Sequence, residues 1–186
     1  MTVLIILGVI LVLVVIIIGM YNSLVQARIK VDNAWSQIDV QLQRRFDLIP
    51  NLIECVKGYM EHEKNTLAKV TELRTSWNKS STIEEKASLG NELSNNLKTI
   101  MAVAENYPAL KANESFNALQ TELSETEDKI AFSRQFYNDT VTIYNTKLET
   151  FPNNIIAKMF GFKSSTLFNV DNENVKKAVN IDFKNT

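Results

Sequence analysis

The pattern of apolar residues changes at residue 20. Residues 2–20 read TVLIILGVILVLVVIIIGM and contain no charged side chain. A helix of this length spans roughly 28 Å, close to the hydrocarbon thickness of a bilayer. The run has neither the basic start nor the small-residue cleavage site that a signal peptide shows. It therefore predicts a retained transmembrane helix.

Beyond residue 20, apolar residues recur every three or four positions, which is typical of one face of an amphipathic helix. No Gly or Pro occurs between residue 20 and Pro50, so the membrane helix is expected to continue as a stiff stalk and to end near residues 77–82. The predicted apolar stripe comprises Val31, Trp35, Ile38, Leu42, Phe46, Ile49, Ile53, Val56, Met60, Leu67 and Val70.

Pro50 interrupts this predicted helix. An internal proline removes one hydrogen bond and clashes with the carbonyl four residues back, that of Phe46, at a cost of about 3 kcal/mol. The flanking triplets DLI and NLI lack the glycine or polar run expected of a reversing loop. Two arrangements follow: a kinked helix in a three-helix bundle, or a reversal at Pro50 that gives a four-helix bundle. The local sequence favours the kink.

Two more helices are predicted downstream. Thr82 and Glu85 have the spacing of a capping box, and this helix should stop before Pro108. The next helix should cover 113–150 and stop before Pro152. The predicted fold is all-α, an up-and-down bundle of three to four helices. We expect an anchor at 1–20, a cytoplasmic bundle at 21–152, and a mostly irregular tail at 153–186 with one helical turn at 155–160.

Composition and charge narrow the class of protein. The 186 residues include 5 Gly and 3 Pro, which fits a few long helices. A formal net charge of −1 and the lack of a basic tail disfavour nucleic acid as a partner. Arg28, Lys30, Arg44 and Arg45 follow the apolar run, so the positive-inside rule predicts a single-pass cell-membrane protein with a short external N-terminus.

Candidate catalytic or metal-binding groups are few. His62 is the only histidine, and Thr66 stands where the HExxH zinc motif needs its second histidine. A single histidine also cannot supply the two Glu-x-x-His pairs of a di-metal bundle. The Ser and Thr residues have no Gly-rich elbow or oxyanion loop. We therefore expect no catalytic residue, no metal and no cofactor, and a packed thiol at Cys55.

Polar residues within or beside the apolar stripes are the remaining candidates. Buried charges in bundles need partners and can fix the register of the helices. The dipeptide YN occurs at Tyr137 and again at Tyr144, so two phenols and two amides share helix faces. They could bind another subunit or lock this helix against the first.

Several spaced motifs together resemble the LemA family of bacterial membrane proteins. They are AWSQIDVQLQRRFDLIPNLIECVKGYMEHE, AENYPALKAN, RQFYNDTVTIYN, FP and FGF. The resemblance implies an N-terminal membrane helix with its short end outside and a cytoplasmic domain related to four-helix bundles. It thereby favours the reversal at Pro50, in contrast to the local sequence, and it implies no catalytic residues. The family markers are Trp35, Asp39, Arg44, Arg45, Pro50, Asn51, Tyr107, Pro108, Tyr137 and Asn138.

The leading functional hypothesis is a non-enzymatic membrane-anchored scaffold that assembles with itself. If the first helix is continuous, its stripe at Trp35 and Leu42 should project past the second helix and require a partner. The alternative is an adaptor or regulator of another membrane protein, such as a protease or sensor. Tyr144 joins these residues and the family markers as an interaction candidate. Phe160, Phe162 and Phe168 beside Lys158 and Lys163 suggest a weak interfacial membrane binder, or packing over the bundle end.

Overall fold

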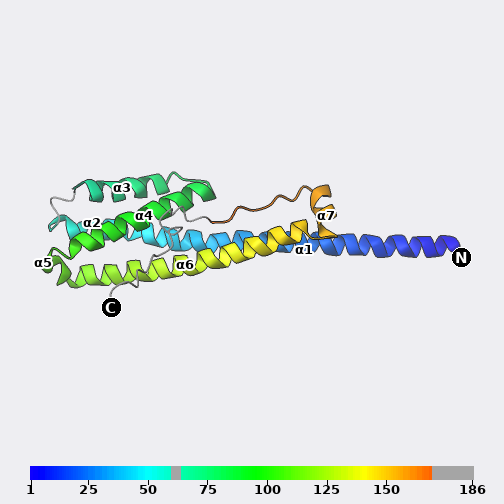
Figure 1. Cartoon of the computed structure of the whole chain (residues 1–186), viewed down its shortest axis with the longest axis horizontal. Helices are drawn as coiled ribbons and strands as arrows, with labels where there is room; N and C mark the ends of the chain where they lie inside the picture. The colour runs from blue at the N-terminus through cyan, green and yellow to red at the C-terminus, as the bar shows by residue number, and fades with distance from the viewer. Residues whose placement is uncertain (60–63, 169–186) are drawn as a thin grey trace, which may run out of the picture.

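The computed structural model describes residues 1–59 and 64–168 of the chain. The described residues form helices joined by turns and by one extended segment, and none of them lies in a β-strand. The all-α prediction is confirmed. Figure 1 shows an elongated molecule in which one long helix projects far beyond the packed part.

Helix α1, Thr2–Asp47, is a single helix of 46 residues. It is long and apolar enough to cross a membrane. Residues 2–19 are exposed, and the first buried side chain on the helix is Leu24. The apolar run and the stalk therefore form one continuous rod, as the sequence predicts.

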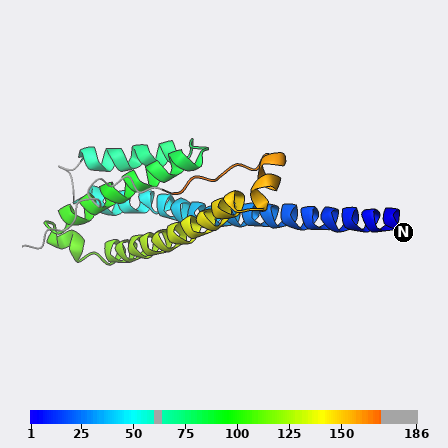
Figure 2. The same ribbon diagram turned by 45° about the vertical axis from the view of Figure 1, so that its right-hand side comes forward.

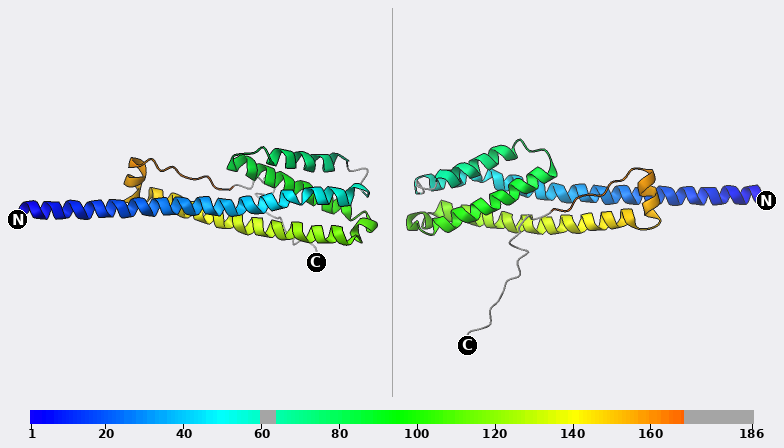
Figure 3. Two further views of the ribbon diagram at one scale, coloured as in Figure 1. Left: turned by 180° about the vertical axis from the view of Figure 1, so that it is seen from behind. Right: turned by 45° about the horizontal axis from the view of Figure 1, so that its top comes forward.

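Pro50 produces a break but not a reversal. Leu48 separates α1 from α2, Ile49–Lys57, and keeps helical dihedral angles of φ −77° and ψ −18°. Pro50 lies in the first turn of α2, where a missing N–H leaves no intrahelical bond unmade. Helix α2 continues in the direction of α1 (Figure 3), so the reversal at Pro50 is wrong.

The chain reverses after α2 instead. Helix α3, Lys64–Trp77, runs back past α2 and packs on α4, so the prediction of one helix reaching residue 77 is wrong. Val56 and Val70 are both buried, and their spacing of two heptads matches a continuous helical stripe. Periodicity alone therefore could not reveal this reversal.

Helix α4, Ile83–Ala104, begins where the sequence predicts. The Thr82 side chain accepts from the backbone N–H of Glu85, and the Glu85 carboxylate accepts from the backbone N–H of Thr82. A short helix α5, Pro108–Lys111, follows and turns the chain once more.

Helix α6, Glu114–Glu149, returns along α1 and is capped by the Asn113 side chain. Four rods therefore lie side by side in alternating directions: α1 with α2, then α3, α4 and α6 (Figures 1 and 2). The stripe of α1 is buried inside this bundle and does not project from it. Its buried members include Val31, Ile38, Leu42, Phe46 and Ile49.

The C-terminal part begins with helix α7, Asn153–Met159, and continues as an extended segment to Phe168. Because four rods alternate, α7 lies beside α1 at the end nearest the apolar run, and the segment runs back along the bundle (Figure 2). The structure reaches this position through a kink at Pro50 and a separate reversal between α2 and α3.

Candidate functional site

Two asparagines on α6 hold the extended segment by its main chain. Asn138 donates from Nδ2 to the carbonyl of Phe168 at 3.2 Å and accepts from the N–H of Phe168 at 2.8 Å. Asn145 makes the same pair of bonds with Ser165, at 2.9 and 3.0 Å. The two amides are seven residues apart, so they project from the same side of α6 two turns apart.

The two tyrosines of the YN repeat add two more bonds to the same segment. Tyr137 donates from Oη to the carbonyl of Thr166 at 2.9 Å, and Tyr144 donates to the carbonyl of Lys163 at 3.0 Å. Burial raises the pKa of both phenols, so they remain protonated donors at neutral pH. We call Tyr137, Asn138, Tyr144 and Asn145 the tail-binding face. All of these bonds go to main-chain atoms, so they fix the segment's path without selecting its side chains.

An aromatic cluster anchors the end of this segment. The ring of Phe168 stacks on Trp35 with centroids 6.2 Å apart, and Trp35 meets Tyr137 edge-on at 5.8 Å. The guanidinium of Arg134 lies 4.5 Å from the centre of the Phe168 ring, a cation–π geometry. The family marker Trp35 therefore joins α1, α6 and the segment. The contact of Tyr137 with Trp35 links α6 to α1, which is one of the two roles expected of the YN repeat, and the binding of another subunit stays a prediction. The sequence did not predict that the repeat holds the extended segment.

A buried polar cluster joins three helices at the middle of the bundle. Arg45 is 4% exposed and donates from Nη1 to Ser94 at 2.8 Å and to the Glu127 carboxylate. Burial lowers the pKa of Arg45, and Glu127 opposes that effect. Arg134 has its pKa lowered by burial too, and the same carboxylate is its counter-charge. The sequence singled out Arg45 but not Ser94 or Glu127, which lie 49 and 82 residues away.

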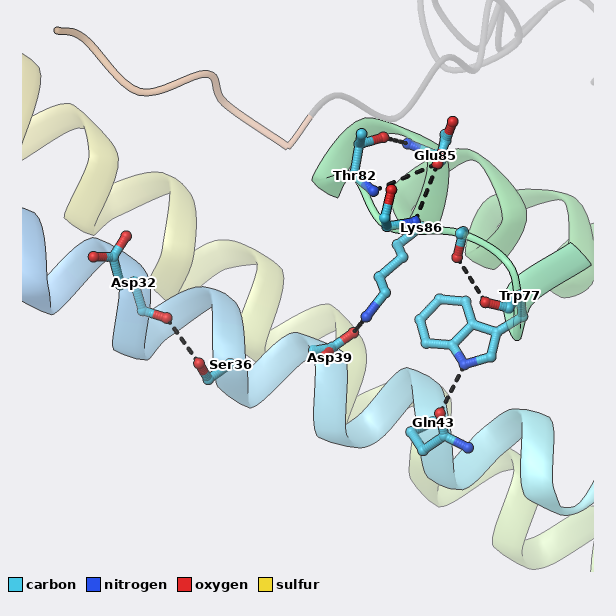
Figure 4. Close-up of polar contacts among 10 residues, drawn as sticks. Asp32, Ser36, Asp39, Gln43, Trp77, Thr82, Glu85 and Lys86 are labelled. Atoms are coloured by element: carbon cyan, nitrogen blue, oxygen red, sulfur yellow. Dashed lines mark hydrogen bonds and ion pairs between the residues drawn. The ribbon is translucent and has the colours of Figure 1, made fainter.

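Asp39 fastens α1 to the start of α4. It accepts from Lys86 Nζ at 2.6 Å, and that ammonium also lies 5.1 Å from the centre of the Trp77 ring. Trp77 in turn donates from Nε1 to Gln43 at 2.8 Å (Figure 4). Arg44 differs from these groups, because its ion pair with Glu122 at 3.6 Å is half exposed.

The other candidate residues lie elsewhere in the bundle. Leu42 is fully buried, and a Cβ added to Gly90 would come within 2.8 Å of it. Pro50 and Asn51 lie on α2, while Tyr107 and Pro108 start α5, and both helices are at the far end of the bundle (Figure 1). The structure therefore distributes the predicted residues over several helix contacts and does not gather them into one cleft.

Within residues 1–59 and 64–168, no group of three or more His, Cys, Asp or Glu side chains is placed to hold a metal ion. His62 lies outside the described residues, so its lack of a catalytic role stays a prediction. Cys55 is half-buried and unpaired with another cysteine, because the chain has a single one.

Exposed apolar side chains occur on the outer sides of both α1 and α6. On α6, Phe132 is 71% and Ile143 is 67% exposed, and Phe136 lies between them. On α1, Ile29 and Val40 are exposed eleven residues apart, which brings them to the same side of the helix. We call these five residues the lateral face.

A groove of about 460 Å³ lies between the two helices of the lateral face. Phe136 and Ile143 form part of its α6 wall. Its other lining residues are mainly polar and include Lys30, Asn33, Gln37, Thr140 and Lys147.

Comparison with known proteins identifies the family. The sequence model of the LemA family matches residues 34–183. The chain belongs to the LemA family. Protein LemA of Metamycoplasma hominis is 29% identical over 155 residues, which cover 81% of this chain and 69% of that protein. The match to the family model begins beyond the apolar run, so it rests on the helical bundle and the tail.

Two further relatives are magnetosome proteins. Magnetosome protein MamQ 2 of Paramagnetospirillum magneticum is 27% identical over 174 residues, and MamQ of Magnetospirillum gryphiswaldense is 25% identical. Each alignment covers 80% of this chain and 64% of the relative. The apolar helix and these relatives together make the chain a membrane-associated helical protein of the LemA family.

Proposed function

We propose that this protein is a non-enzymatic, single-pass scaffold that is anchored in the cell membrane by α1 and assembles with further copies of itself. Arg28 and Lys30 follow the apolar run within ten residues, which supports a cytoplasmic bundle and a short N-terminus outside. The lateral face is the observation that carries the proposal.

The lateral face replaces the surface that the sequence suggested. Trp35 and Leu42 were expected to project towards a partner, but Leu42 is buried in the bundle and Trp35 packs on Phe168. The apolar side chains that do face outwards are Phe132 and Ile143 with their three neighbours. Phe132, Phe136 and Ile143 lie on one side of α6, and exposed apolar side chains gathered in this way mark protein interaction sites.

The membrane favours a second copy as the occupant of this face. Fully burying one such side chain contributes roughly 1.5–3 kcal/mol. Association must offset the loss of translational and rotational freedom. Copies that share one bilayer through α1 have already lost part of that freedom, and their lateral faces lie at the same height above the membrane. A few shared side chains then suffice for assembly.

The structural roles of the buried and half-buried polar residues support a non-enzymatic function. Arg45, Asp39 and the tail-binding face each hold one part of the chain against another. Each of these groups binds a structural partner, and none of them lines one of the pockets found among the described residues. A catalytic site needs a nucleophile or acid–base pair with mutual geometry.

A double substitution on α6 tests self-assembly. We expect Phe132→Ser with Ile143→Ser to reduce the mass of the particles that the full-length protein forms in mild detergent, as measured by light scattering. The matched control is Phe151→Ser with Ile155→Ser, which removes two exposed apolar side chains at and just before α7 and should leave the mass unchanged. Unchanged mass in the α6 variant, with helix content intact in both, would reject this face as the interface.

The alternative is an adaptor for another membrane protein. The groove beside the lateral face is lined by Lys30 and Lys147, and no acidic residue occurs among its described lining residues. A partner with acidic side chains would complement it better than an identical copy. A crosslinker placed at Phe132→Cys in a Cys55→Ser background separates the two hypotheses. Crosslinks between identical chains support the scaffold, whereas a single product with a different protein supports the adaptor.

A further inference from the structure

Helix α7 packs on α1 directly beyond the apolar run. Leu24 of α1 is fully buried against Ile156 and Ala157 of α7. The ring of Tyr21 lies 4.9 Å from that of Phe160 and 5.6 Å from that of Phe162. These contacts fix the height of α7 along α1: it lies within about one helical turn of residue 20.

The opposite side of α7 is apolar and exposed. Ile155 and Met159 are one turn apart and are 55% and 61% exposed. Phe151, four residues before Ile155, is 76% exposed. We call Phe151, Ile155 and Met159 the α7 patch. The helix therefore buries Ile156 and Ala157 against α1 and turns a second apolar surface away from the bundle.

We propose that the α7 patch inserts into the boundary between headgroups and acyl chains of the bilayer that α1 crosses. The hydrocarbon core is roughly 30 Å thick and the whole bilayer about 40–45 Å, so the headgroup layer extends on the order of 5–8 Å beyond the apolar run. Leu24 lies four residues, or about 6 Å, beyond residue 20. The height of α7 coincides with this layer, where interfacial helices bury their apolar side chains.

Basic side chains around the patch favour the same location. Lys158 lies on α7 and Lys163 follows it, and both are exposed. Arg28 of α1 lies over the ring of Phe162 at 5.6 Å from its centre, on the bundle side of α7. Cations at this height attract anionic lipid headgroups. The nearby acidic residue Glu149 is exposed at the end of α6.

This contact would give the bundle a second point of attachment to the membrane. A single spanning helix leaves the bundle free to tilt and to rotate about α1. The α7 patch lies to one side of α1, and the tail-binding face ties the residues after α7 to α6. Insertion would therefore fix which side of the bundle faces the membrane and leave the lateral face of α1 and α6 at a defined height. The inference rests on the membrane span of α1 but not on self-assembly.

Lipid quenching of a fluorescent probe tests the proposal. The probe is attached to Ile155→Cys in a Cys55→Ser background, and the full-length protein is reconstituted in vesicles of phosphatidylcholine and phosphatidylglycerol. The matched control carries the probe at Phe132→Cys, an exposed apolar position on α6. We expect quenchers near the headgroup end of the acyl chains to quench the α7 probe several-fold more strongly than the control.

Equal quenching at the two positions, strong or weak, would overturn the proposal. A second probe at Met159→Cys guards against a local effect of one label, and it must give the same result as the first. Both readings are independent of particle mass. A protein that fails to assemble can still show α7 insertion, and one that assembles can still lack it.

Discussion

The hydrogen bonds of the tail-binding face lead to a quantitative prediction. Asn138 and Asn145 each make two hydrogen bonds to main-chain atoms of the segment that ends at Phe168. A hydrogen bond of this kind contributes about 1 kcal/mol net, so Asn→Ala at either position should weaken the local structure by about 2 kcal/mol. Because a tenfold change corresponds to about 1.4 kcal/mol, the amide of the contacted residue should exchange about 30-fold faster.

Hydrogen exchange of the full-length protein in detergent, resolved by residue, measures this effect. For Asn145→Ala the amide of Ser165 should lose protection, and for Asn138→Ala that of Phe168. The control is Asn117→Ala, which removes a single exposed bond to the carbonyl of Lys111 at the other end of α6. Amides in the middle of α6 should keep their rates in all three variants. Unchanged protection of Ser165 and Phe168 would refute the role assigned to the two asparagines.

Three further predictions concern the bundle. Arg45→Met should lower the free energy of unfolding in urea by about 2–3 kcal/mol. The double variant with Glu127→Gln should lose less stability than the sum of the two single variants, and additive losses would contradict a coupling between Arg45 and Glu127. Gly90→Val should destabilise the fold by about 1–3 kcal/mol, because the new Cβ would lie 2.8 Å from the buried side chain of Leu42 on α1. Unchanged stability would show that Leu42 can move aside. Thr82→Ala should cost about 1 kcal/mol. Hydrogen bonds from backbone N–H groups lower the pKa of Glu85. The carboxylate should therefore stabilise the fold above the usual carboxyl pKa, and this stabilisation should be lost as pH falls through the lowered pKa. Glu85→Gln should abolish that pH dependence of stability.

The sequence predicted those elements whose signals are local. The capping box at Thr82 and the stop before Pro152 depend on residues a few positions apart, and the structure has them. The apolar run of α1 likewise requires no knowledge of the fold. Each of these features could be read without a partner helix.

The sequence failed where local signals were ambiguous or partners were distant. At Pro50 the sequence favoured a kink but left a reversal open, and the structure has the kink, because a proline in the first turn of α2 is compatible with a nearly straight path. The reversal occurs instead after Lys57, where the helical spacing continues unchanged across the gap. The partners of Arg45 and the residues bound by the YN repeat could not be predicted, because tertiary packing alone brings them together.

The particle mass of the unmodified protein tests the central claim most directly. The full-length chain would be purified in a mild detergent and its protein mass measured by light scattering after size exclusion. Self-assembly predicts discrete particles many times heavier than one chain of 21.1 kDa, with the mass retained on dilution. A monodisperse particle that holds a single chain across the same concentrations would contradict the scaffold.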